Sequence, residues 1–217
     1  MSAKAISKYL EQYAEPETEG FQPLKNKLFD RCLVIPAFAE TPKFIKRISK
    51  TWQREDKLLV ILIINRPDPC EPETLEKANL FLNRTEQTLA LVISSSEKTS
   101  WRQATPDGPM FLLVDRCSNF PIPVKQGVGL ARKIGCDIAL KLYSQGSLET
   151  DWVHTSDADA HLPADYFDHE FSSGSAKAFP HRYLEAAPAL EQATKIYDRR
   201  NTYYQQELRK AGSAYGF

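Results

Sequence analysis

The chain has 217 residues, of which 42% are hydrophobic and 26% are charged. This composition indicates one large globular domain, or one domain with a smaller second one. Its 28 lysine and arginine residues balance its 28 aspartate and glutamate residues, so no net charge draws it to nucleic acid or to an acidic membrane. No apolar stretch has the length of a membrane span, and the N-terminus lacks a signal-peptide core. We therefore predict a cytoplasmic protein with no transmembrane segment.

The first 28 residues are predicted to form a helical arm and a linker. Apolar side chains recur at helical spacing over residues 4–14, and the linker over residues 15–20 contains Pro16. Residues 29–217 are then predicted to form the main domain. The four cysteines of the chain lack C-x-x-C spacing, which favours buried, reduced thiols.

Short apolar runs predict the strands of the main domain. Each run has the length of a strand that is buried on both faces, as in a parallel sheet. The predicted strands cover residues 32–36, 58–64, 89–93, 111–114 and 152–155, with a sixth at residues 176–180. The polar stretch between the third and fourth strands, residues 94–109, is predicted to be a long surface loop.

Helical patterns alternate with these strands. The first helix is predicted to begin with Thr41 as its N-cap and Pro42 at its first position. The later helices are predicted at residues 72–83, 127–143, 163–171 and 189–211. Strands that alternate with helices indicate an α/β fold, with a mostly parallel sheet and helices on both faces.

Polar clusters directly follow four of the predicted strands. They cover residues 37–40, 65–68, 115–116 and 157–161. In parallel α/β sheets, ligands bind beyond the carboxyl ends of the strands. We therefore expect the four clusters on one edge of one sheet, where carboxylates would repel one another without a cation.

Asp157 and Asp159 form an Asp-x-Asp pair after the fifth predicted strand. Where the strand end bends, both side chains can converge on one cation. Carboxylates suit a hard ion, Mg²⁺ or Mn²⁺, that also holds substrate phosphates, and a nitrogen ligand from His161 would favour Mn²⁺. The alternative is a turn in which the aspartates hydrogen-bond to nearby backbone. The bare motif does not decide between the two.

Three stretches, taken together, resemble a known family. Residues 33–40, Leu-Val-Ile-Pro-Ala-Phe-Ala-Glu, are similar to the opening strand and loop of family 2-like glycosyltransferases with the GT-A fold. Residues 127–135 resemble the glycine-led helix of that family, with its Ala-Arg pair, and residues 157–159 fall where the family carries its Asp-x-Asp metal motif. The resemblance extends over residues 30 to 180 and implies a nucleotide-diphospho-sugar transferase (GT-A) fold.

The resemblance implies transfer of a sugar from a nucleotide-sugar donor to a carbohydrate or lipid-linked acceptor. It also implies Mn²⁺ or Mg²⁺, which would neutralise the charge that develops on the leaving diphosphate. By match, Ala37 and Glu40 would lie near the nucleotide, and Arg132 near the base or the diphosphate. Asp157 would contact the donor ribose or the metal, and Asp159 would bind the metal.

The chain departs from the family pattern at two places. The second strand ends with residues 65–68, Asn-Arg-Pro-Asp, where the family commonly has paired acidic residues. Asp68 would lie near the base or ribose by match, and Asn65 is the alternative for that contact. The catalytic base stays unknown, and the chain ends at Phe217, soon after the metal motif. We therefore expect either a fragment or an enzyme with a minimal acceptor half.

Three candidate residues also have a simpler interpretation. Arg132 would be a surface arginine of an amphipathic helix, and Glu40 would stabilise the N-terminus of the following helix through its dipole. Asp115 would be either a site carboxylate or a turn residue.

Three other functions compete with glycosyl transfer. A dinucleotide-dependent oxidoreductase fits least, because the glycine pattern that begins at Gly127 has Arg132 at its sixth place. A sugar nucleotidyltransferase would need a glycine-rich, basic loop after the first strand, and residues 36–39 do not provide one. The third alternative is a non-catalytic or truncated module that only binds a nucleotide sugar.

Overall fold

The computed structural model describes residues 2–19, 21–118, 120–169 and 188–212. The chain divides into two compact units, Met1–Phe167 and Asp168–Phe217. Helix α5 (Pro188–Lys210) is the described element of the second unit, and it confirms the helix predicted at residues 189–211. The strand predicted at residues 176–180 lies outside the described residues.

The first unit is built on a six-stranded sheet in the order β4-β5-β6-β2-β1-β8. Its strands are β1 (Arg31–Ala37), β2 (Leu58–Asn65), β4 (Leu91–Ser95), β5 (Thr99–Gln103), β6 (Met110–Arg116) and β8 (His154–Thr155). Adjacent strands in the run β6-β2-β1-β8 are parallel, whereas β5 is antiparallel to both of its neighbours. The short strands β3 (Pro67–Asp68) and β7 (Ile122–Pro123) form a separate parallel pair. The predicted α/β fold with a mostly parallel sheet is confirmed.

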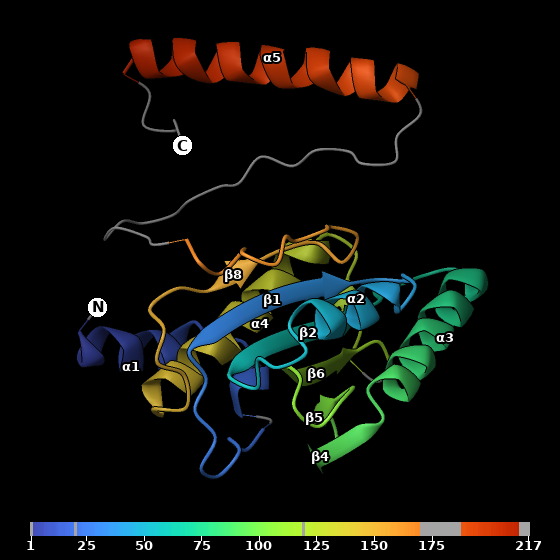
Figure 1. Ribbon diagram of the computed structural model, residues 1–217, viewed down its shortest axis with the longest axis vertical. Helices are drawn as coiled ribbons and strands as arrows, with labels where there is room; N and C mark the ends of the chain where they lie inside the picture. Colours follow the sequence, from blue (N-terminus) through green and yellow to red (C-terminus); the bar gives the residue numbers. More distant parts are fainter. Residues whose placement is uncertain (1, 20, 119, 170–187, 213–217) are drawn as a thin grey trace. The chain divides into compact units, whose positions relative to one another are not determined.

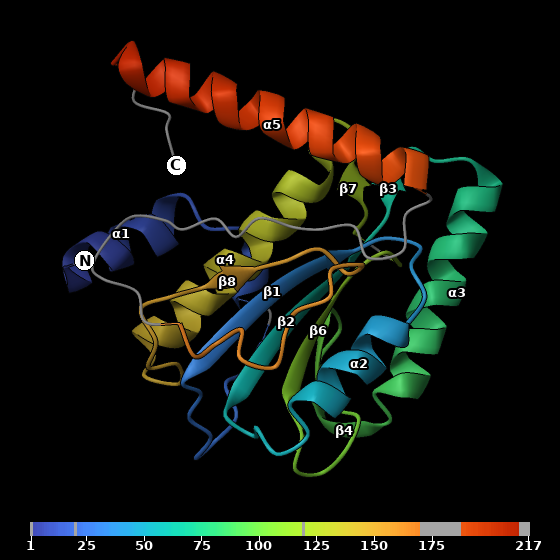
Figure 2. The same ribbon diagram turned by 45° about the horizontal axis from the view of Figure 1, so that its top comes forward.

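Helices cover both faces of this sheet (Figures 1 and 2). They are α2 (Lys43–Thr51), α3 (Pro72–Thr88) and α4 (Gly127–Ser144), and α4 in turn contacts α1 (Ala3–Gln12) and the 3₁₀ turn η1 (Pro16–Glu19). The side chains of α2 and α3 share one hydrophobic core with one face of the sheet, and those of α4 share a second core with the other face. Every residue of β2 is buried, because β2 lies inside the sheet with a core on each side. This explains its continuous apolar sequence.

Helix α4 lies close against the sheet at Gly135. A Cβ atom added there would lie 2.3 Å from Cγ1 of Val34 and 2.8 Å from Cδ1 of Ile63. Only glycine permits this approach of the helix to β1 and β2. The glycine that the sequence places at the end of the 127–135 stretch therefore sets the distance between α4 and the sheet.

Four sequence-based expectations about the fold are wrong. Residues 94–109 are not one loop, because β5 lies within them. The predicted buried strand at residues 89–93 corresponds to β4, whose five residues are all exposed at the sheet edge. Turns, not a helix, occupy residues 164–167. The N-cap of α2 is Pro42, not Thr41, and it makes no side-chain capping bond.

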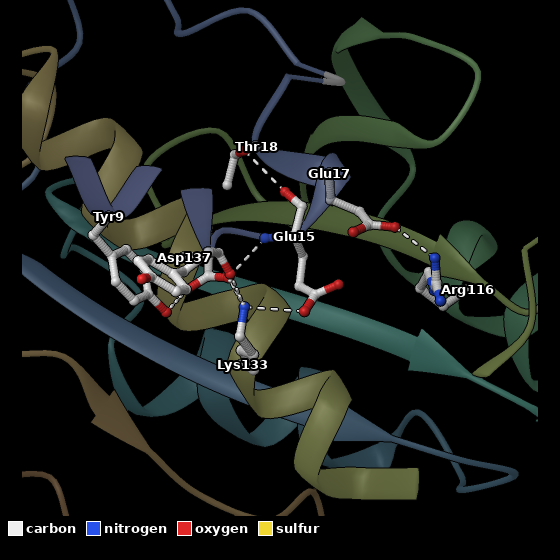
Figure 3. Close-up of polar contacts among 8 residues, drawn as sticks. Tyr9, Glu15, Glu17, Thr18, Arg116, Lys133 and Asp137 are labelled. Atoms are coloured by element: carbon white, nitrogen blue, oxygen red, sulfur yellow. Dashed lines mark hydrogen bonds and ion pairs between the residues drawn. The ribbon is translucent and has the colours of Figure 1, made fainter. Parts of the chain in front are cut away.

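Buried polar contacts hold the N-terminal arm against the sheet unit (Figure 3). The carboxylate of Asp137, on α4, accepts hydrogen bonds from the hydroxyl of Tyr9 at 2.8 Å, the backbone N–H of Glu15 at 2.9 Å and Nζ of Lys133 at 2.7 Å. Glu17 forms an ion pair of 2.6 Å with Arg116, and its side chain is only 1% exposed. We call these residues the arm cluster. They join α1 and η1 to α4 and to the end of β6.

No helix in the described part of the chain is both long enough and apolar enough to cross a membrane.

Candidate functional site

The four predicted polar clusters lie at one edge of the sheet. Strands β1, β2, β6 and β8 run parallel, so the residues at or just beyond their carboxyl ends meet at the same edge. We call this the carboxyl edge. Ala37, the last residue of β1, is buried, and Asn65, the last residue of β2, is 8% exposed. The sequence therefore placed these clusters correctly, because strand direction alone determines the edge.

Asp157 and Asp159 lie on a tight turn directly after β8. The turn continues the pairing of β8 with β1, since the N–H of Ser156 donates to the carbonyl of Val34 at 3.1 Å. It then closes through a bond of 3.2 Å from the N–H of Ala160 to the carbonyl of Asp157. Both aspartate side chains are exposed beside this closed backbone. The strand end bends here, as the metal hypothesis expects.

Arg47, on α2, contacts this turn through two hydrogen bonds to its backbone. Its Nη2 atom donates to the carbonyl of Ala160 at 2.8 Å and to that of Ala158 at 3.3 Å. The cavity left between α2 and the turn has a volume of about 10 Å³, room for about one water molecule. Sequence reasoning missed Arg47. The sequence feature that could have indicated Arg47 is its position: it is a cation on the helix that directly follows the first polar cluster.

Arg132 and Asp157 form an ion pair across the carboxyl edge. Arg132 lies on α4, three residues before Gly135, so the close approach of that helix brings its guanidinium towards the turn. The side chains are 38% and 59% exposed, and Nε of Arg132 is buried without a hydrogen-bond partner in the described structure. Arg132 therefore contacts the Asp-x-Asp pair and has, in its Nε–H group, a donor without a partner among the described residues.

Glu40 lies close enough to Asp159 for their charges to interact. Partial burial raises the pKa of Glu40, and the negative charge of Asp159 raises it further. Burial also lowers the pKa of Arg47, while Asp159 opposes that change. Glu40 therefore lies near the turn that carries Asp159, and the part of the structure that is described shows no side-chain cap on α2. The preceding residue, Ala39, has φ of 50°, a left-handed conformation that is uncommon for alanine.

The polar residues after β2 and β6 have mixed roles. Asp115 accepts bonds at Oδ1 from the N–H groups of Cys117 at 2.8 Å and Ser118 at 2.9 Å, so the structure shows the turn role for this residue. Arg66 donates from Nε to the carbonyl of Cys117 at 2.8 Å and thereby ties the two strand ends together. Asp68 is exposed, with its Oδ1 atom 3.7 Å from Nη1 of Arg66. Asn65 and Asp68 both stay available as candidates for the base or ribose contact.

The structure offers two carboxylates for a metal ion, not a complete ligand set. No three His, Cys, Asp or Glu side chains among the described residues come together as a metal-binding group. His161 is exposed and does not complete such a group with the two aspartates. Mg²⁺ is commonly held by one or two carboxylates plus substrate phosphates and water. Asp157 and Asp159 are the two carboxylates that such a donor set would use.

No protein-family model, curated protein or solved structure matches the chain. The role of the carboxyl edge therefore rests on the side chains that meet there.

Proposed function

We propose that the carboxyl edge binds a nucleotide-diphospho-sugar with Mn²⁺ or Mg²⁺, and that the chain is a glycosyltransferase of the GT-A type. One observation carries this proposal. Glu40 and Arg132, from two separate parts of the sequence, lie beside the turn that carries Asp157 and Asp159 at the carboxyl edge of a parallel sheet. The resemblance to family 2-like glycosyltransferases supports the same assignment.

The charges at the edge match a diphosphate and a cation together. Asp157 and Asp159 would hold the ion, which on binding neutralises charge on the diphosphate. Arg132 would bind the diphosphate oxygens, because guanidinium groups match the geometry of phosphate. The Arg132 side chain is 38% exposed, which leaves part of it open to a ligand. Arg47 keeps the turn in one conformation and so reduces the ordering that donor binding requires.

Transfer requires an acceptor beside this donor. The acceptor hydroxyl forms a bond to the anomeric carbon while the bond from that carbon to the diphosphate oxygen breaks, and a base takes the hydroxyl proton. The acceptor in this proposal is a carbohydrate or a lipid-linked molecule. Asn65 or Asp68 would hydrogen-bond to the base or ribose of the donor.

Calorimetry with a panel of nucleoside diphosphates and sugar nucleotides tests the proposal. Each ligand is titrated once with Mn²⁺ and once with a chelator. We expect binding of at least one nucleoside diphosphate that is tenfold or more weaker in chelator, a difference of about 1.4 kcal/mol. Equal affinity in both conditions would remove the metal from the proposal, and no binding of any ligand would remove the nucleotide site.

A second measurement separates an enzyme from a binding module. Release of free nucleoside diphosphate from the sugar nucleotide that binds is followed with and without acceptor extracts. A transferase is expected to turn over and to be stimulated by acceptor. Binding without any turnover would favour the non-catalytic module.

A further inference from the structure

A second polar groove lies away from the carboxyl-edge residues, between α2, α3 and the loop after β5. Its volume is about 730 Å³, within the range of about 300–1,000 Å³ typical of small-molecule sites. Lys46, Ser49 and Lys50 line it from α2, and Arg84 lines it from α3. None of Glu40, Arg132, Asp157 and Asp159 lines this groove.

The groove is positively charged without compensation. Lys46, Lys50 and Arg84 make no ion pair with any residue that the structure describes, and none of the residues lining the groove is acidic. Neighbouring cations differ, because Arg102 pairs with Glu86 at 2.7 Å and Arg47 donates to backbone carbonyls. Three like charges around one groove repel one another, and an anion between them would relieve that repulsion.

Ser49 supplies a second and independent indication of a ligand. The residue is 7% exposed and lines the groove, and its Oγ atom is buried with no hydrogen-bond partner in the described structure. Buried hydroxyls almost always have a partner, so one without a partner calls for an explanation. A ligand oxygen in the groove would satisfy it once the side chain turns about its Cα–Cβ bond, because the Oγ atom is closed to solvent in the unliganded structure.

We propose that this groove binds a phosphate-bearing ligand. Phosphate oxygens would accept charge-assisted hydrogen bonds from Lys46, Lys50 and Arg84, and one would accept from the Ser49 hydroxyl. The carboxamides of Gln53 and Gln87, which also line the groove, would bind the part of the ligand that carries the phosphate. Phosphate fits better than a single carboxylate because it offers enough oxygens for all three cations and the hydroxyl. The site is independent of the proposed donor site.

Binding of inorganic phosphate and of pyrophosphate to the full chain tests the proposal. The titrations are made at fixed ionic strength and in chelator, which excludes metal-dependent binding at the carboxyl edge. We expect pyrophosphate to bind and to raise the melting temperature. Arg84→Gln and Lys50→Gln should each weaken binding about tenfold, since each removes one charge-assisted contact.

Two control variants, Lys77→Gln and Thr85→Val, make the result specific. Lys77→Gln removes one charge from α3 outside the groove and should leave the affinity unchanged. Ser49→Ala should weaken binding while the unliganded protein melts at the same or a higher temperature, because an unsatisfied buried hydroxyl is lost. Thr85→Val removes another buried hydroxyl without a partner, one that does not line the groove, and should leave binding unchanged.

A vesicle-binding experiment distinguishes a lipid headgroup from a soluble ligand as the source of the phosphate. Sedimentation with vesicles that contain phosphatidic acid is compared with vesicles of phosphatidylcholine alone. Binding only to the phosphatidic acid vesicles, lost in Arg84→Gln, would identify a lipid headgroup, whereas binding of free pyrophosphate would identify a soluble ligand. Absence of both, or an equal loss in Lys77→Gln and Arg84→Gln, would overturn the proposal.

Discussion

The arm cluster and the carboxyl edge contain the same kinds of residue in opposite environments. In the arm cluster, the Asp137 side chain is 3% exposed and accepts three hydrogen bonds. At the carboxyl edge, the Asp157 side chain is 59% exposed and pairs with one arginine. A buried carboxylate whose bonds are all made inside the chain has none left for a ligand, whereas an exposed one does. The burial of a charged side chain and the hydrogen bonds it already makes, more than its residue type, therefore decide whether it stabilises the fold or can bind a ligand.

The largest effect is expected from Asp137→Ala. The change leaves the donors of Tyr9, Glu15 and Lys133 without their common acceptor, and should lower the free energy of unfolding by about 3 kcal/mol. Burial lowers the pKa of Lys133, but hydrogen bonds to Asp137 and Glu15 outweigh it, and the pKa lies above its ordinary value. Urea unfolding measures the change.

Asp56→Ala serves as the matched control for that measurement. Asp56 also forms an ion pair, of 2.7 Å with Lys27, but its side chain is 58% exposed. Its removal should alter stability by less than about 1 kcal/mol. Similar losses in the two variants would show that burial does not distinguish the arm cluster.

A double-mutant cycle on Glu17 and Arg116 should give the next largest effect. Arg116→Met leaves the carboxylate of Glu17 buried without its cation, and we expect a loss of about 2–3 kcal/mol. The double variant Glu17→Met, Arg116→Met should lose less than the sum of the two single variants, because neither charge is then stranded. Strict additivity in thermal or urea unfolding would contradict a direct pairing.

Asp159→Asn should separate binding from folding at the carboxyl edge. It keeps the size of the side chain and removes one anionic ligand, so metal-dependent nucleotide binding should weaken tenfold or more, about 1.4 kcal/mol. Stability should change by less than about 0.5 kcal/mol, because the residue is exposed. Asp165→Asn, an exposed aspartate of the same segment outside the motif, is the control. A variant that unfolds yet binds normally when folded would indicate a structural turn aspartate.

The smallest expected effect is on the titration of Glu40. Its pKa is raised in the folded protein, so its contribution to stability is most favourable below its unfolded pKa and is lost as the pH rises through the folded pKa. Asp159→Asn should lower the pKa of Glu40 towards its ordinary value and reduce that loss. Carbon-detected NMR titration of the Glu40 carboxyl measures it, and an unchanged pKa would mean that the two side chains do not interact.

Much of the first unit could be predicted from apolar patterns. Strands β1, β2 and β6 are long buried runs, and α4 ends within one residue of its predicted end. Strand β5 could not be predicted, because Thr-Ser-Trp-Arg-Gln is mostly polar. Its polar groups have partners that only the fold supplies: Arg102 pairs with Glu86, and the amide of Gln103 donates to the carbonyl of Gly108 at 2.9 Å. The polar sequence of β5 therefore did not indicate a buried strand, because the hydrogen bonds that allow its burial come from residues outside the strand.

By itself, the sequence determined the parallel order of strands and helices, and with it the edge on which residues 37–40, 65–68, 115–116 and 157–161 meet. Those features follow from local periodicity and from strand direction, both of which a single chain segment encodes. Only the tertiary structure decided that Asp115 serves a turn, that Arg132 reaches Asp157, and that Asp137 is buried under the arm. The role of a charged side chain depends on the residues that pack against it, and many of those residues are distant in sequence.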